Sequence, residues 1–286
     1  MENMLSEKQS LHFGLTLKVT KSLHHEVSDF QTMDIVETPE FGRVMLIDGE
    51  IMVTEKDEFV YHEMLAHPAL FIHPNPKKVL IIGGGNGGTL REVCRHSTVE
   101  RAVLCEIDEM VIKASKEFFP LITEGFSNPK TEIFICDGMA CISELEEFFD
   151  VILVDSTDLI RQDQLLFEEE FLQMCEKRLV KNGILALQCE CLYIREKQPI
   201  IRKVYQNLHK LFPIVAPYLA PIHTYQTGLW MFMFASKQYS PNDRNDKLFF
   251  HRYSKYTEQY ELKYFNEEIR KACFALPNFV RDILGK

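Results

Sequence analysis

The chain has 286 residues, 46% of them hydrophobic, and a formal net charge of −10 from 32 basic and 42 acidic residues. This length accommodates one α/β domain with a smaller appendage. The acidic balance argues against a nucleic-acid partner, and no apolar run reaches the length of a membrane span. The first residues contain no apolar signal segment, so we expect a cytoplasmic protein with no membrane partner.

The first seventy-odd residues show the apolar–polar alternation that is typical of half-buried strands. Turn signals at Thr38–Gly42 and Asp48-Gly49 separate these strands. They predict a small antiparallel β-domain, followed by a helix that Pro74-Asn75-Pro76 ends. We therefore expect an N-terminal β-domain with its connecting helix over residues 1–76. The expected strands and helix are Leu15–Val19, Met33–Glu37, Arg43–Val53 and Asp57–Leu70.

From Lys77 onward, short apolar strands alternate with amphipathic helices. This alternation predicts a doubly wound, mostly parallel α/β sheet over residues 77–286. Ligands in such sheets bind beyond the carboxyl ends of the strands. The expected strands are Val79–Ile82, Ala102–Cys105, Glu132–Cys136, Val151–Val154, Ile184–Gln188 and Trp230–Ala235. The expected helices are Thr89–His96, Glu109–Phe119, Met139–Phe148, Glu168–Val180 and Pro199–Leu211.

A glycine-rich turn follows the first of these strands. Residues 83–88 are all glycine except Asn86. Glycines let the backbone approach a ligand closely, and the helix that starts near Thr89 points its N-terminus at that ligand. This unit predicts a nucleotide-binding turn.

The next three strands of the sheet all end in an acidic residue. Glu106 lies about 20 residues beyond the turn, where a carboxylate can accept the ribose hydroxyls of a nucleoside. Asp137 is placed to meet the exocyclic amine of a base, and Asp155 and Asp158 follow the fourth strand. Crowded carboxylates repel each other unless a cation binds, and the turn contains no Lys or Arg for a phosphate. We therefore expect a cationic, phosphate-free nucleoside such as S-adenosylmethionine or a relative.

The 8 cysteines are scattered, and several lie in apolar runs where Cys packs as a small hydrophobe. The nearest approach to a metal pattern is Cys189-x-Cys191, whose spacing places both side chains on one face of a strand. No second pair stands near it in sequence. We therefore expect reduced packing thiols and no metal site.

Several ordered motifs resemble those of the spermidine synthase family, and the resemblance covers nearly the whole chain after about Leu15. It implies a Rossmann-like fold of the class I methyltransferase type and a homodimer or homotetramer. The motifs are Thr54–His67, Gly83–Val93, Glu106-Ile107-Asp108, Asp137-Gly138, Asp155–Asp158, Thr224–Trp230, Tyr264-Phe265-Asn266 and Phe274–Pro277.

The family transfers an aminopropyl group from decarboxylated S-adenosylmethionine, a co-substrate, to putrescine. Spermidine and methylthioadenosine are the products. The sulfonium donor is already activated, so the resemblance implies neither a metal nor another cofactor. Asp155 matches the general base of the family, which deprotonates the acceptor amine; such a base contributes roughly 10²–10⁴ in rate.

The resemblance also assigns the remaining site residues. The donor-binding residues are Gln31, His62, Asn86, Glu106, Asp137 and Gly138, with Glu106 on the ribose and Asp137 and Gly138 on the adenine. The acceptor-binding residues are Tyr61, Asp158 and Tyr225. Trp230 either walls the acceptor channel or packs in the core.

The chain departs from the family pattern mainly on the acceptor and aminopropyl side. Asn86 stands where the family has an Asp that holds the aminopropyl ammonium. The family's prolines and glycine are missing after Asp158, and Gln226 replaces a Pro. The N-terminal segment lacks the family's aromatic-plus-acidic start, which helps to bind the far amine.

Three functional hypotheses follow. The first is a putrescine aminopropyltransferase. The second is a related amine transferase that uses another diamine, or that transfers methyl from S-adenosylmethionine, whose carboxylate Asn86 repels less than Asp would. The third is a non-catalytic nucleoside-binding homologue, against which the presence of both Asp155 and Asp158 counts.

Overall fold

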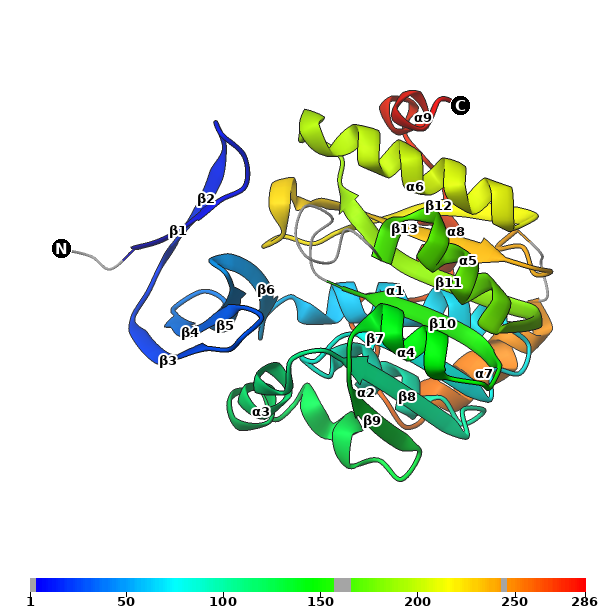
Figure 1. The fold of residues 1–286 in the computed structure, drawn as a ribbon, viewed down its shortest axis with the longest axis horizontal. Coiled ribbons are helices and arrows are strands. Elements are labelled where there is room, and N and C mark those ends of the chain that lie inside the picture. The colour runs from blue at the N-terminus through cyan, green and yellow to red at the C-terminus, as the bar shows by residue number, and fades with distance from the viewer. Residues whose placement is uncertain (1–3, 157–165, 243–245) are drawn as a thin grey trace.

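The computed structural model describes residues 4–156, 166–242 and 246–286, whose strands form three sheets. A two-stranded hairpin and a four-stranded antiparallel sheet come first, and a seven-stranded sheet follows (Figure 1). The hairpin is β1 (Met4–Lys8) and β2 (Gly14–Lys18), and the four-stranded sheet is β3 (Lys21–Val27), β4 (Thr32–Thr38), β5 (Gly42–Ile47) and β6 (Glu50–Thr54).

The expected strand material over Arg43–Val53 forms two strands, β5 and β6, which the predicted turn at Asp48-Gly49 separates. Asp48 and Gly49 both have positive φ angles, of 51° and 84°, and turn the chain back on itself. The Asp48 carboxylate accepts a hydrogen bond from the amide of Thr32 at 2.8 Å, which ties this turn to β4. The turn that the sequence predicts at this point therefore makes a hairpin.

The large sheet has the strand order β12-β13-β11-β10-β7-β8-β9. Strands β7 to β11 are parallel, and β13 lies antiparallel between β11 and β12. This confirms the doubly wound, mostly parallel sheet of the class I methyltransferase type. Its strands are β7 (Lys78–Gly83), β8 (Arg101–Glu106), β9 (Thr131–Ile135), β10 (Phe149–Asp155), β11 (Leu179–Cys191), β12 (Ile214–Pro221) and β13 (Leu229–Ser236).

Helices cover both faces of this sheet. The α-helices are α1 (Glu58–Ile72), α2 (Gly88–Arg95), α3 (Glu109–Phe118), α4 (Gly138–Glu144), α5 (Glu169–Arg178), α6 (Gln198–Leu211), α7 (Asp246–Thr257), α8 (Glu267–Ala272) and α9 (Asn278–Leu284). Short 3₁₀ helices are η1 (Thr123–Ser127), η3 (Arg195–Lys197) and η4 (Gln226–Gly228). None of the helices in the described part of the chain is both long and apolar enough to cross a membrane.

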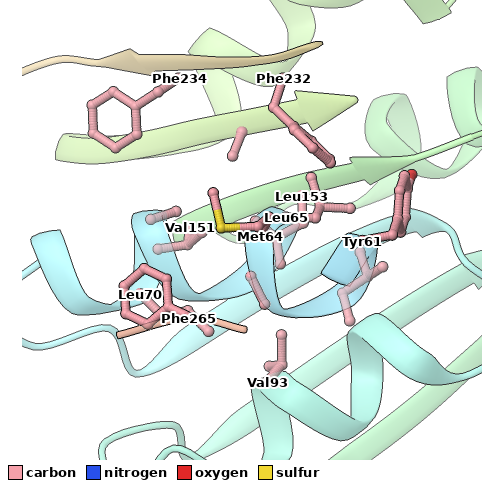
Figure 2. Packing of buried hydrophobic residues seen from close by; sticks show 14 of the residues in the cluster. Tyr61, Met64, Leu65, Leu70, Val93, Val151, Leu153, Phe232, Phe234 and Phe265 are labelled. Carbon is pink, nitrogen blue, oxygen red and sulfur yellow. The ribbon is translucent and has the colours of Figure 1, made fainter. Parts of the chain in front are cut away.

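The core of the large domain lies on either side of the sheet. One cluster joins the sheet to α1, α2 and α7, and the other joins it to α4, α5, α6 and α9. Figure 2 shows Met64 and Leu65 of α1 beside Val151 and Leu153 of β10. Because nearly every side chain of α1 is buried, this helix fixes the approach of the N-terminal segment to the sheet. The expected division at residue 76 stays a prediction.

The four-stranded sheet packs on α3 through apolar side chains. Met33 and Met45 of that sheet share a buried cluster with Met110, Val111 and Ala114 of α3. Helix α3 follows β8 directly, so this packing places β4 to β6 over the carboxyl edge of the large sheet. The N-terminal sheet therefore supplies one wall of any site at that edge.

The expected common face for Cys189 and Cys191 is wrong. The register between β11 and β13 shifts between Gln188 and Glu190, so the strand bulges at Cys189. An extra residue reverses the alternation of side chains between the two faces of a sheet. Cys189 accordingly packs in the cluster with α5 and α6, and Cys191 packs in the cluster with α1.

The expectation of reduced packing thiols fits six cysteines and is wrong for two. Cys189 and Cys191 are free and buried, and burial raises the pKa of both thiols. Cys105 and Cys141 instead form a disulfide in the structure. Nothing in their spacing predicts this pair, because β8 and α4 meet only when the sheet is assembled.

Candidate functional site

A cavity of about 520 Å³ lies at the carboxyl edge of the large sheet. Gly83 at the end of β7 pairs with Asp155 at the end of β10, and both line it. The chain crosses from β7 to β8 on one side of this point and reaches β10 on the other, which is where doubly wound sheets bind ligands. Side chains of the N-terminal sheet, including Asp48 and Glu50, close the opposite wall.

The glycine turn is shaped by its contact with Asp155. Gly83 and Gly84 have φ angles of 79° and 75°, a region that residues with a Cβ rarely adopt. A Cβ on Gly84 would lie 2.6 Å from Oδ2 of Asp155, and one on Gly83 would lie 2.2 Å from its carbonyl oxygen. Glycine is required here because the carboxylate and the turn occupy adjoining space.

Two hydroxyl groups orient the Asp155 carboxylate, which is 7% exposed. The Tyr61 hydroxyl donates to Oδ1 at 2.7 Å, and the Thr89 hydroxyl donates to Oδ2 at 2.6 Å. Burial raises the pKa of Tyr61, and the Asp155 charge raises it further, so Tyr61 remains a neutral donor. A carboxylate accepts up to about four hydrogen bonds, so Asp155 retains the capacity to accept from a ligand.

Glu106 is held against the glycine turn by backbone amides. Its Oε2 accepts from the amide of Gly85 at 2.8 Å, and its Oε1 accepts from that of Asp108 at 3.1 Å. Asp108 in turn caps α3 and accepts from the Gln31 side chain at 3.0 Å. Both Gln31 and Glu106 line the cavity, so β4, β8 and α3 position this wall together.

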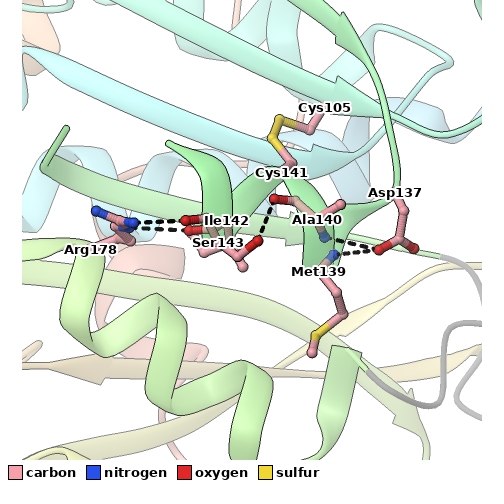
Figure 3. The surroundings of a disulfide bond; sticks show 8 residues. All are labelled: Cys105, Asp137, Met139, Ala140, Cys141, Ile142, Ser143 and Arg178. Carbon is pink, nitrogen blue, oxygen red and sulfur yellow. Dashed lines mark hydrogen bonds between the residues drawn. A yellow bond between two sulfur atoms is a disulfide. The ribbon is translucent and has the colours of Figure 1, made fainter. Parts of the chain in front are cut away.

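Asp137 caps helix α4. Its Oδ1 accepts from the amides of Met139 and Ala140 at 2.9 and 3.0 Å (Figure 3). Asp137 and Gly138 both line the cavity. The cap holds the start of α4 at the cavity edge and fixes where this carboxylate lies.

Asn86 lines the cavity from within the turn. Its Oδ1 accepts a hydrogen bond from the amide of Gly88 at 2.8 Å, at the start of α2. The side chain therefore has a structural partner in addition to any ligand.

His62 lies behind the cavity wall and is not one of its lining residues. A Cβ on Gly88 would lie 2.2 Å from Cε1 of His62, so the ring packs against the start of α2. His62 Nδ1 lies 2.6 Å from Oε2 of Glu58, and its Nε2 is buried with no hydrogen-bond partner among the described residues. Arg91 completes this group with two hydrogen bonds to Glu58, each of 2.9 Å.

The pairing of Glu58 predicts a loss of stability in acid. Burial alone would raise its pKa, but the hydrogen bond with His62 and the Arg91 charge lower it to about 2. A lowered pKa stabilises the folded state above the unfolded value of about 4.3, and this contribution disappears as the pH falls toward 2. We expect the thermal midpoint of the wild type to fall over this window. The Glu58→Gln variant should have a lower thermal midpoint at pH 7. Its midpoint should then fall less than that of the wild type between pH 4.5 and 2.

A second chamber, of about 30 Å³, adjoins the first and shares Glu50, Tyr61 and Tyr225 with it. The rings of Tyr61 and Tyr225 lie 5.4 Å apart, and the Tyr225 hydroxyl donates to the carbonyl of Met52 at 2.7 Å. Trp230 is buried, lines this chamber and contacts the Tyr225 ring at 5.0 Å. The expected core position of Trp230 is therefore confirmed, and its role as a wall of the acceptor channel stays a prediction.

Glu7 lies at the far side of this chamber and is 3% exposed. Gln9 donates to its Oε2 at 3.1 Å, and the amide of Ile51 donates to its Oε1 at 3.4 Å. The N-terminal segment thus supplies an acidic residue to this chamber. The residue that pairs with Glu7 in the hairpin is Leu15, which is not aromatic.

A buried ion pair lies beside the same chamber. Lys197 Nζ is 2.7 Å from Oε1 of Glu190 and 2.5 Å from Oε1 of Gln226. Gln226 lines the chamber, so its amide is oriented by the Lys197 ammonium. Proline, which the family pattern has at this position, has no side-chain amide to be held in this way.

The structure brings most of the predicted residues into one place. Those that line the large cavity are Gln31, Tyr61, Asn86, Glu106, Asp137, Gly138, Asp155 and Tyr225. His62 lies one layer behind it, and Asp158 lies outside the described residues. The sequence does not predict three further residues of the site, which are Thr89, Glu7 and Glu50. The position of Thr89 directly after the glycine turn is a signal that could have identified it. The two glutamates reach the site only through the tertiary fold.

Models of protein families match most of the chain. The spermine/spermidine synthase domain matches residues 58–247, and the spermidine synthase tetramerisation domain matches residues 5–55. The chain belongs to the spermidine synthase family.

Relatives of this family are similar over their full length. A polyamine aminopropyltransferase of Bacillus cereus is 42% identical over 284 residues, which are 99% of this chain and 100% of that protein. One of Thermotoga petrophila is 45% identical over 274 residues, which are 95% and 90% of the two chains.

Solved spermidine synthases have the same fold. A spermidine synthase in complex with the transition-state analogue AdoDATO superposes with a TM-score of 0.93 at 43% identity, over 99% of this chain and 95% of that one. The spermidine synthase of Thermotoga maritima gives a TM-score of 0.90 at 42% identity, over 99% and 94%. The chain is accordingly a polyamine aminopropyltransferase of the spermidine synthase family, and its tetramerisation domain makes it an oligomer-forming protein.

A cluster of three cysteines lies at this site, and none of them is among the predicted site residues. The sulfur atoms of Cys105, Cys136 and Cys141 lie within 4.8 Å of one another. Cys105 also lines the cavity. Three sulfurs at this spacing are also a ligand set for a thiophilic metal when reduced, so the expected absence of a metal stays a prediction.

Proposed function

We propose that this chain transfers the aminopropyl group of decarboxylated S-adenosylmethionine to putrescine, with Asp155 as the general base. The observation that carries the proposal is the position of Asp155. Its carboxylate touches the nucleoside-type turn on one side and Tyr61, which lines both chambers, on the other. A base at this junction is placed between a donor in one chamber and an acceptor in the other.

The donor half follows from the walls of the large cavity. Glu106 accepts the ribose hydroxyls, and Asp137 and Gly138 meet the adenine. Gln31 also contacts the donor, and Asn86 faces its aminopropyl group. The AdoDATO complex of the related spermidine synthase supports a donor of this class. His62 is retained as a donor contact, and its buried Nε2 is the atom that has hydrogen-bonding capacity to spare among the described residues.

The acceptor half extends from Asp155 through the small chamber. Tyr61 and Tyr225 offer aromatic faces to a cationic chain. Asp158 is the third residue proposed for the acceptor. Glu50, which lines both chambers, and Glu7, which lines the small one, add negative charge. A diamine therefore places its reacting amine at Asp155 and its second ammonium toward Glu7.

The chemistry needs one proton transfer and one displacement. Asp155 removes a proton from the acceptor ammonium, and the lone pair so formed attacks the aminopropyl carbon bonded to sulfur. A C–N bond forms as the C–S bond breaks, and the bonding electrons return to sulfur, which leaves neutral methylthioadenosine. Tyr61 and Thr89 hold the carboxylate in line for this step, an orientation effect comparable in size to the base itself.

Product analysis separates this proposal from its alternative. The protein is incubated with putrescine or another diamine, and with decarboxylated or intact S-adenosylmethionine. The products methylthioadenosine and S-adenosylhomocysteine are then measured. Methylthioadenosine from the decarboxylated donor with putrescine is expected. S-adenosylhomocysteine from the intact donor would instead support methyl transfer, which Asn86 favours because an amide repels a carboxylate less than Asp does.

The Glu7→Gln variant tests the direction of the acceptor. A charge-assisted hydrogen bond to the second ammonium is lost, so KM for putrescine should rise about 10-fold while kcat changes little. Butylamine, which lacks the second ammonium, is the matched control and should react equally with both proteins. An unchanged KM for putrescine would place its far end elsewhere.

We further propose a homodimer or homotetramer in the cytoplasm, with residues 1–76 as the assembling unit and 77–286 as the catalytic one. The match of residues 5–55 to a tetramerisation domain supports the tetramer. Light scattering on the intact chain and on a chain without the hairpin β1–β2 measures the assembly.

A further inference from the structure

Three cysteines lie together at the nucleoside end of the cavity. Cys105 is at the end of β8, next to Glu106, and Cys136 directly precedes Asp137. Cys141 lies in α4, the helix that begins at the cavity edge. Cys105 and Cys141 are bonded to each other, as Figure 3 shows, and the Cys136 sulfur is within 4.8 Å of both.

The three sulfurs differ in access to solvent. Cys105 is 1% exposed and Cys141 is 4% exposed, whereas Cys136 is only partly buried. A reagent in solution therefore reaches Cys136 more easily than it reaches the bonded pair. A third thiol next to a disulfide is also the arrangement that thiol–disulfide exchange needs, because the attacking sulfur must contact the bond that it breaks.

We propose that Cys105, Cys136 and Cys141 form a thiol–disulfide exchange site, in which Cys136 is the entry point for a low-molecular-weight disulfide and the Cys105–Cys141 bond is the product. The three cysteines are not among the residues proposed for aminopropyl transfer.

The steps balance with one external disulfide, RSSR, as the oxidant. The Cys136 thiol loses its proton and attacks RSSR, which forms a Cys136–SR mixed disulfide and releases RSH. The thiolate of Cys141 then displaces the second RSH and forms a Cys136–Cys141 bond. Cys105 attacks Cys141 in this bond, which forms Cys105–Cys141 and returns Cys136 to its thiol. Two thiols are oxidised, and one RSSR is reduced to two RSH.

The bond connects two elements that hold the candidate nucleoside pocket. It ties the end of β8, which carries Glu106, to α4, whose first residue is Gly138. Oxidation therefore fixes two walls of the pocket relative to each other, and preorganised walls bind a ligand more tightly. This consequence rests on the proposed function. By linkage, a nucleoside that binds the oxidised form better also favours formation of the bond.

The site itself is tested by mass spectrometry, without an activity assay. Fully reduced protein is exposed to oxidised glutathione, and the free thiols are alkylated and mapped. The wild type should form the Cys105–Cys141 bond. Cys136→Ala should form it at least 10-fold more slowly. The double variant Cys105→Ala, Cys141→Ala keeps neither thiol that can attack the mixed disulfide, so it should accumulate one glutathione on Cys136. Cys175→Ala is the matched control. Cys175 is fully buried on α5 and is not one of the three neighbouring sulfurs, so its loss should leave the rate unchanged.

Two results would overturn the exchange site: wild-type protein whose three cysteines all remain alkylated thiols, or a Cys136→Ala variant that oxidises at the wild-type rate. The link to the nucleoside is read separately. Methylthioadenosine should bind the oxidised form several-fold more tightly than the reduced form by calorimetry. Equal binding with intact exchange would reject the link, and no binding by either form would count against the proposed function instead.

Discussion

The Asp155→Asn variant should lose roughly 10²–10⁴ in kcat for aminopropyl transfer, because an amide cannot take the proton of the acceptor ammonium. The variant is expected to fold. Both partners of the carboxylate are hydroxyl groups, from Tyr61 and Thr89, and a hydroxyl accepts a hydrogen bond from an amide as readily as it donates to a carboxylate. The measurement is single-turnover formation of methylthioadenosine at saturating donor and putrescine.

Methylthioadenosine binding by the same variant is the control. It should stay within a few-fold of the wild type, because Glu106 and Asp137, the residues proposed for the nucleoside end, are unchanged. Thr89→Val provides a milder comparison, since it removes one orienting hydrogen bond and leaves the base in place. If Asp155→Asn abolishes nucleoside binding, Asp155 is a structural residue; if it retains wild-type turnover, the base is another group.

The large sheet was predictable because its parallel strands are buried on both faces and read as short apolar runs. Strands β12 and β3 are not predicted, because neither reads as a short apolar run. Strand β12 contains Pro217 and Pro221, which a sheet tolerates at an edge, and β12 is the edge strand of this sheet. Strand β3 is mostly exposed and polar, so it has no apolar alternation to detect.

The candidate site was predictable where it lies next to a strand end. Glu106, Asp137 and Asp155 follow strands of one sheet, and topology alone brings them to one edge. Glu7 and Glu50 lie on the hairpin and the N-terminal sheet, whose packing on the large domain has no local signal. The bulge at Cys189 and the meeting of Cys105 with Cys141 likewise depend on contacts between distant segments.

The Asn86 side chain tests whether the glycine turn binds the aminopropyl ammonium. Asn86→Asp should tighten decarboxylated S-adenosylmethionine roughly 10- to 100-fold, the effect of restoring a charge-assisted hydrogen bond of about 1.5–3 kcal/mol to the aminopropyl ammonium. The turn should tolerate the change. The Asn86 oxygen already accepts from the amide of Gly88 at the start of α2, and a carboxylate is favourable at the N-terminus of a helix.

Methylthioadenosine is the matched ligand, since it lacks the aminopropyl group and should bind Asn86→Asp and wild type equally. Calorimetry with both ligands therefore separates the charge effect from any change in the turn. Intact S-adenosylmethionine adds a carboxylate next to the ammonium, and repulsion should offset part of the gain for that donor. The affinity for decarboxylated S-adenosylmethionine, relative to that for intact S-adenosylmethionine, should thus be higher in the variant than in the wild type. Equal tightening of methylthioadenosine and the decarboxylated donor would mean that the substitution acts on the turn and that Asn86 does not face the ammonium.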